Sequence, residues 1–73
     1  MAARDIKLLD VVALTVDVPE GKLERGQVGT VVEVHAPGAF EVEFVDSNGR
    51  TYALTTLHAD QLLLLRDDPS AAA

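Results

Sequence analysis

The chain has 73 residues, with 6 Lys and Arg against 12 Asp and Glu and a formal net charge of −6 at pH 7. This length allows one domain with a small core, so self-association would add useful stability. A surface that binds nucleic acid needs a stripe of basic residues, whereas the basic residues here are scattered singly. DNA and RNA are therefore not the expected partners.

The composition also bears on where the protein works. The chain has no cysteine, so it has neither a disulfide nor a thiolate metal site. The opening residues, Met-Ala-Ala-Arg-Asp, lack the apolar stretch of a signal peptide, and no apolar run approaches the about 18 residues of a membrane span. We therefore expect a cytoplasmic protein without a cofactor.

Apolar and β-branched runs separated by turn residues predict five short strands. In chain order they are expected near Val11–Val16, Val28–His35, Phe40–Val45, Thr51–Thr55 and Leu62–Leu65. The polar loop Asp17–Arg25 follows the first strand, and a helical or 3₁₀ turn over Thr56–Asp60 precedes the last. We expect residues 6–66 to form the domain, with a flexible arm at 1–5 and a disordered tail at 67–73.

The first tight turn predicts how the second and third strands pair. With the turn on Pro37–Ala39, Val34 lies opposite Val42 and Val32 lies opposite Phe44. The same register predicts the polar pairs Glu33–Glu43 and His35–Glu41.

The second turn, Ser47–Gly49, predicts the pairing of the third and fourth strands, with Gly49 placed to adopt the left-handed conformation. Asp46 then lies opposite Arg50. The two hairpins agree on the same core columns, which are Val34–Val42–Leu54 and Val32–Phe44–Tyr52.

A three-stranded meander with one apolar face needs something to pack on. The two remaining apolar segments have the length of strands, and closing the sheet would remove its exposed edges. We predict an all-β fold, a small SH3-like barrel of about five short antiparallel strands with a 3₁₀ turn before the last. The alternative is an OB-type barrel, which the short strands and the lack of a helix-length segment after the third strand disfavour.

Five blocks of sequence occur in a characteristic order, and they are Leu9–Leu14, Gly26–Glu33, Phe40–Phe44, Asn48–Leu54 and Ala59–Leu62. Together they resemble a family of short bacterial proteins that has an SH3-like fold and carries only a domain-of-unknown-function label. This resemblance covers about Ile6 to Leu65 and implies no catalytic or binding residues. The strand start at Gly26 is also loosely similar to KOW-type modules of transcription and translation factors and to the small barrel of nitrile hydratase β-subunits. The KOW-like resemblance implies contact with RNA or the ribosome, which the acidic composition opposes.

Three residues, His35, His58 and Asp60, are the only metal-ligand candidates. The simpler interpretation is that His35 pairs with Glu41 at the surface and that Asp60 ends the turn. We therefore predict no metal site.

Catalytic chemistry is also not expected. A barrel of this size fills its interior with side chains, which leaves no desolvated pocket to move carboxylate pKa values apart. The segment Gly26–Gly29 is not a phosphate loop, because no Gly-Lys-Ser/Thr follows it.

The glutamates Glu33, Glu41 and Glu43 are predicted to form an acidic stripe on the solvent face of the meander. Like charges on paired strands cost up to about 1 kcal/mol. The stripe either meets a basic partner or keeps the sheet from stacking on other sheets, and the second interpretation is the simpler.

The run Leu62–Leu65 predicts an exposed apolar surface, because alternate residues of a strand point to opposite faces. If Leu62 and Leu64 enter the core, Leu63 and Leu65 face outward, with Leu8, Leu9 or Val45 nearby. A patch of this kind is large for a monomer and predicts self-association or docking at the edge made by the first and last strands. The alternative is that Ile6–Leu9 folds back over the leucines.

These observations predict a non-enzymatic protein-interaction or assembly module that forms a homo-oligomer or binds another protein. Its candidate contact residues are Leu63, Leu65, Glu33, Glu41 and Glu43, together with the loop Asp17–Arg25. That loop lacks the aromatic pair that recognises proline-rich peptides. The alternatives are an antitoxin or immunity-type partner of a neighbouring protein and a KOW-like module associated with RNA or the ribosome.

Overall fold

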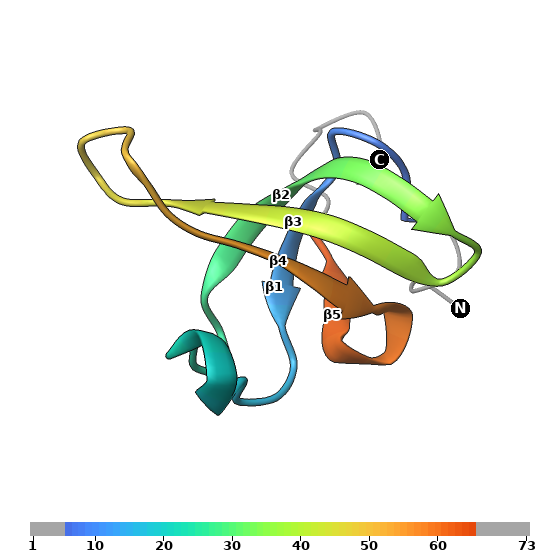
Figure 1. The fold of residues 1–73 in the computed structure, drawn as a ribbon, viewed down its shortest axis with the longest axis horizontal. Coiled ribbons are helices and arrows are strands. Elements are labelled where there is room, and N and C mark those ends of the chain that lie inside the picture. The colour runs from blue at the N-terminus through green and yellow to red at the C-terminus, as the bar shows by residue number, and fades with distance from the viewer. Residues whose placement is uncertain (1–5, 66–73) are drawn as a thin grey trace, which may run out of the picture.

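The computed structural model of the protein describes residues 6–65. Its five strands form one antiparallel sheet in the order β4-β3-β2-β1-β5 (Figure 1). The strands are β1 (Val11–Leu14), β2 (Val28–Ala36), β3 (Ala39–Val45), β4 (Thr51–His58) and β5 (Leu62–Leu64). The 3₁₀ turn η3 (Ala59–Gln61) precedes the last strand, and η2 (Pro19–Gly21) lies in the loop between β1 and β2. The predicted all-β fold of about five short antiparallel strands, with a 3₁₀ turn before the last, is confirmed.

Some segment ends differ from the predicted ones. β1 ends at Leu14 rather than at Val16, and β4 continues to His58 rather than Thr55 because it stays paired with β3. The predicted arm at residues 1–5 and the predicted tail at residues 67–73 lie outside the described residues. Residues 6–65 contain no helix long and apolar enough to cross a membrane.

The bent sheet encloses an apolar core on its inner face. In Figure 1, β2, β3 and β4 cross over β1 and β5, and all five strands contribute side chains to a single buried cluster. Its members are Ile6, Val12, Leu14, Leu23, Val31, Phe40, Val42, Phe44, Leu57 and Leu62. Among residues 6–65 no polar or charged side chain is buried.

The first hairpin differs from its predicted pairing. Ala36 pairs with Ala39, so the turn has only Pro37 and Gly38 at its tip, and Gly38 has a left-handed φ of 79°. The register then shifts at two bulges, one between Val31 and Glu33 and one between Val34 and Ala36. Each bulge adds one residue to β2 and reverses which side chains face the core.

These bulges show that the predicted core residues of β2 were wrong. Val31 rather than Val34 lies opposite Val42, and Val31 is fully buried. Val32 and Val34, both assigned to the core from the sequence, are 36% and 44% exposed.

The second hairpin has its predicted loop. The amide of Asp46 donates to the carbonyl of Arg50 at 2.8 Å, and Gly49 has a left-handed φ of 81°. The three-residue turn and the pairing at its base are therefore confirmed.

Beyond that loop, one more bulge shifts β4 against β3. Phe44 pairs with Ala53 rather than Tyr52, and Thr55 takes the position predicted for Leu54. Leu54 is consequently 57% exposed. Tyr52, the extra residue of the bulge, lies beside Phe44 with ring centroids 6.3 Å apart but is 48% exposed. The predicted place of both residues in the core was wrong.

Candidate functional site

An exposed apolar surface lies on the outer face of β5, β1 and β2. Leu63 lies opposite Ala13, which in turn lies opposite Val28. Leu63 is 50% exposed, Val28 is 48% exposed, and Val11, on the same face as Ala13, is 39% exposed. We name Leu63, Ala13, Val28 and Val11 the apolar patch. Sequence reasoning missed Val11 and Val28, because only the pairing of β1 with both neighbours brings them beside Leu63.

Leu65 borders the apolar patch. Its amide donates to the carbonyl of Val11 at 2.9 Å, and its side chain is half-buried. The segment Ile6–Leu9 does not hide these residues: Ile6 is buried in the core, and Leu63 remains half exposed.

Three glutamates lie on the outer face of β2 and β3, and we name Glu33, Glu41 and Glu43 the acidic patch. Glu33 lies opposite Glu41, which corrects the predicted Glu33–Glu43 pair. The two patches adjoin, because Thr30 pairs with Val11 on one side and with Glu43 on the other.

Glu41 is held in place by two neighbours. Its Oε1 accepts hydrogen bonds from Nε2 of His35 and from Oγ1 of Thr56, each at 2.8 Å. The bond to Glu41 raises the pKa of His35 above its ordinary 6.5, and the charges of Glu33 and Glu41 act in the same direction. The bonds from His35 and Thr56 lower the pKa of Glu41 below its ordinary 4.5. The predicted contact between His35 and Glu41 is present, although His35 lies at a bulge rather than directly opposite.

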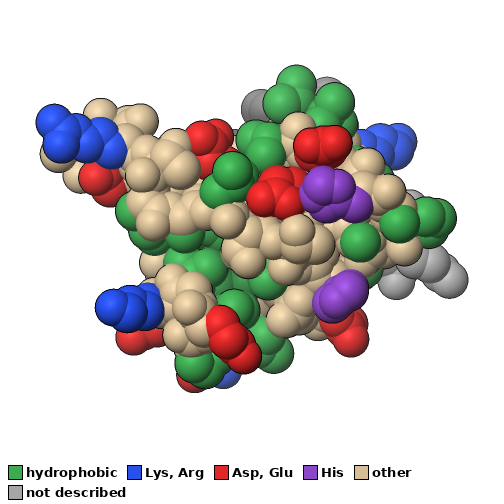
Figure 2. Space-filling model, viewed as in Figure 1, with side chains coloured by type: hydrophobic (Ala, Val, Ile, Leu, Met, Phe, Trp, Pro, Cys, Tyr) green, Lys and Arg blue, Asp and Glu red, His purple; other side chains and the backbone are tan. Residues whose placement is uncertain are grey.

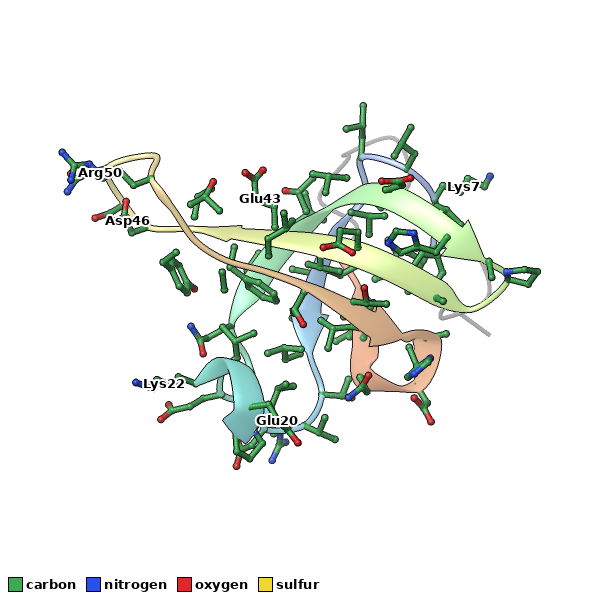
Figure 3. The ribbon with its side chains drawn as sticks, viewed as in Figure 1. Lys7, Glu20, Lys22, Glu43, Asp46 and Arg50 are labelled. Carbon is green, nitrogen blue, oxygen red and sulfur yellow. The ribbon has the colours of Figure 1, made fainter. Side chains whose placement is uncertain are left out.

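Apart from His35, which is charged only when protonated, the charged side chains on the strands of the outer face are all acidic. None of the five strands contains Lys or Arg, and their carboxylates are the three of the acidic patch. The basic residues among 6–65 are in loops, and they are Lys7, Lys22, Arg25 and Arg50. Figure 2 shows blue side chains only at the periphery, whereas red ones lie both beside them and near the centre of the view. In Figure 3 Glu43 rises from β3, while Lys7, Lys22 and Arg50 lie at the ends of the molecule.

The metal-ligand candidates do not form a site in the described part of the chain. Within residues 6–65 no group of three or more His, Asp and Glu side chains is placed to hold a metal ion. His35 bonds to Glu41, while His58 ends β4 and its amide bonds to Gln61 at 2.8 Å.

Hydrogen bonds of the backbone hold the loop Asp17–Arg25 in its conformation. Val18 and Leu23 bridge it with N–O distances of 2.8 and 3.0 Å, and the amide of Arg25 bonds to Oδ1 of Asp17 at 2.9 Å. Leu23 is buried and anchors the loop to the core. The remaining charged side chains of the loop are exposed.

Comparison with known proteins identifies one family. No curated protein and no solved structure was found to match the chain. A family model described as a domain of unknown function (DUF4926) matches residues 8–64, a range that includes all five strands. The chain therefore belongs to the DUF4926 family of domains of unknown function.

Proposed function

We propose that this protein is a cytoplasmic, non-enzymatic interaction module that binds a basic partner protein through the outer face of its sheet. The observation that carries the proposal is the junction of an apolar patch with an acidic patch on a face whose strands contain no Lys or Arg.

The two patches would contribute differently to binding. Covering apolar surface stabilises a complex by about 25 cal/mol per Å². Leu63 and Val28, both about half exposed, supply such surface. Glutamates of one sign attract a basic surface, speed its encounter and set its orientation more than they add affinity.

We propose no enzymatic role because of where the ionisable side chains lie. Acid–base catalysis uses groups whose pKa values are moved apart by burial. Among residues 6–65 no ionisable side chain is buried, and the shifted pKa values of His35 and Glu41 arise mainly from their mutual hydrogen bond at the surface.

The proposal is compatible with an antitoxin or immunity-type protein and disfavours a KOW-like RNA module. An antitoxin or immunity-type protein that blocks a basic site would use this kind of surface. A KOW-like RNA module would need basic residues on the sheet, and the strands have none.

A direct test is the binding of a fluorescent basic peptide that contains interspersed leucines, followed by anisotropy. We expect binding at low ionic strength and its weakening at about 0.5 M salt, where charges are screened within a few Å. The double variant E33Q/E43Q, which leaves the His35–Glu41 bond intact, should weaken binding about tenfold.

The matched control is E20Q/E24Q, which removes the same charge from the exposed loop between β1 and β2. It should change binding much less. Equal weakening by both double variants would mean that only net charge acts, and the outer face would not be the binding surface.

A further inference from the structure

Among residues 6–65 the sheet has two edges without a neighbouring strand, and these edges differ in length and in pairing. Its order places β4 at one edge and β5 at the other. Natural edge strands are kept from pairing with another chain by charges, prolines, bulges or very short length. β4, Thr51–His58, has no charged residue or proline but has a bulge at its start, opposite Val45, whereas β5 has only three residues. β5, Leu62–Leu64, has neither charge nor proline, and it pairs with β1 without a register shift.

The hydrogen bonds of β5 show which backbone groups face the open edge. Thr15 donates to Gln61 and Leu65 donates to Val11, each at 2.9 Å, and Leu63 lies opposite Ala13 between these bonds. Hydrogen-bonded and non-bonded positions alternate in an antiparallel pair. The amide and carbonyl of Leu64 therefore point away from β1.

Leu62 is less suited to pair with another strand, because its amide already donates a hydrogen bond to the carbonyl of Ala59. Leu64 is thus the one residue of β5 with both backbone groups directed to the open edge. An antiparallel strand that presents the same arrangement in reverse would satisfy both groups with a single residue.

We propose that a second copy of this chain pairs with β5 in antiparallel orientation, with Leu64 opposite the partner's Leu64 at the two-fold axis. The two residues then exchange both backbone hydrogen bonds. On the outer face Leu63 meets the partner's Leu65, and Leu65 meets the partner's Leu63. Such an interface is isologous, since the same residues serve on both sides.

The distribution of charge favours a second copy over a charged partner at this edge. The segment Gln61–Leu65 contains no charged residue, and the acidic patch lies on β2 and β3, away from β5 in the strand order. Two chains of net charge −6 can therefore meet here without bringing their glutamates together. The pairing would also add buried surface to a domain that is small for its stability.

This inference goes beyond the binding of a basic partner, although both proposals use Leu63, and variants of the acidic patch separate them. The joined sheets would present two outer faces side by side. Neither Glu33 nor Glu43 lies on β5, so E33Q/E43Q should weaken binding of the basic peptide and leave the pairing unchanged.

Sedimentation equilibrium over a range of concentrations tests the pairing. We expect the wild type to reach twice the mass of one chain. Leu63→Glu should raise the dissociation constant of the dimer about a hundredfold, because it places a carboxylate against the partner's leucine. The matched control is Leu54→Glu on β4, where the original leucine is similarly exposed at 57%, and it should leave the mass unchanged.

Amide hydrogen exchange supplies the second measurement. The amide of Leu64 should exchange quickly in dilute solution and become protected as the concentration rises. A wild type that stays monomeric at all concentrations would overturn the inference. Dimers that survive Leu63→Glu, or that Leu54→Glu disrupts equally, would overturn it as well.

Discussion

The inner and outer faces of the sheet differ in chemistry and in packing. On the inner face, side chains such as Val31 and Phe44 have no exposed surface and belong to the apolar core cluster. On the outer face, side chains such as Leu63 keep about half of their surface exposed, and glutamates replace apolar residues on β3. The inner face thus sets the stability of the fold. Residues of the outer face can be substituted, or covered by a partner, with little change in that stability.

The largest expected effect comes from truncating one large side chain on each face. Phe44→Ala should lower the free energy of unfolding by about 3–5 kcal/mol, because it leaves a cavity in a fully buried site. Leu63→Ala should change it by about 0.5 kcal/mol or less when the protein is dilute enough to be monomeric. Urea denaturation followed by circular dichroism measures both. Similar losses for the two variants would mean that the outer face also stabilises the monomer.

A smaller difference in the free energy of unfolding is expected between variants of Gly29 and Thr30, two neighbours on β2 that point to opposite faces. A Cβ at Gly29 would lie 2.7 Å from Cγ1 of Val42 and 2.9 Å from the carbonyl oxygen of Glu43. Gly29→Ala should therefore destabilise the domain by about 1–3 kcal/mol, because the backbone of β3 must move.

Thr30→Ala, on the outer face, is the matched control and should cost about 0.5 kcal/mol or less. The same denaturation measurement compares them. A neutral Gly29→Ala would show that β2 and β3 can separate without loss and that the inner face is less tightly packed than the distances indicate.

The fold class could be predicted because its evidence is local. Turn residues such as Gly49 and the alternation in Phe40–Phe44 are read directly from the chain, and both occur as expected. The register across strands could not be predicted, because a bulge moves every following residue to the other face and has no marker here. Val32 and Leu54, assigned to the core from strict alternation, are exposed for this reason.

The candidate site was predictable to a similar extent. The outward position of Leu63 and the contact of His35 with Glu41 follow from short segments of sequence, and the structure places both there. The membership of Val11 and Val28 in the apolar patch depends on β1 pairing with β2 and β5 at once. The sequence of one segment does not indicate which distant segment it pairs with.

The smallest effect concerns the pH dependence of the acidic patch. The pKa of His35 is raised by its bond to Glu41, so its contribution to stability is complete below about pH 6.5 and is lost as the pH rises through the folded-state pKa. The pKa of Glu41 is lowered, so its contribution is present above about pH 4.5 and is lost as the pH falls through the folded-state pKa. The pair therefore stabilises the outer face most between pH 4.5 and 6.5.

An NMR titration of the His35 ring measures this interaction without unfolding the protein. In the wild type the midpoint should lie above 6.5, and Glu41→Gln should return it toward 6.5 because the hydrogen bond to a carboxylate is the largest cause of the shift. Glu33→Gln removes only the attraction of a charge that makes no hydrogen bond to His35, and it should lower the midpoint less. If Glu33→Gln had the larger effect, the general field of the acidic patch rather than one hydrogen bond would control the histidine. The acidic patch would then act as a diffuse charge, whereas the inner face depends on contacts between individual atoms.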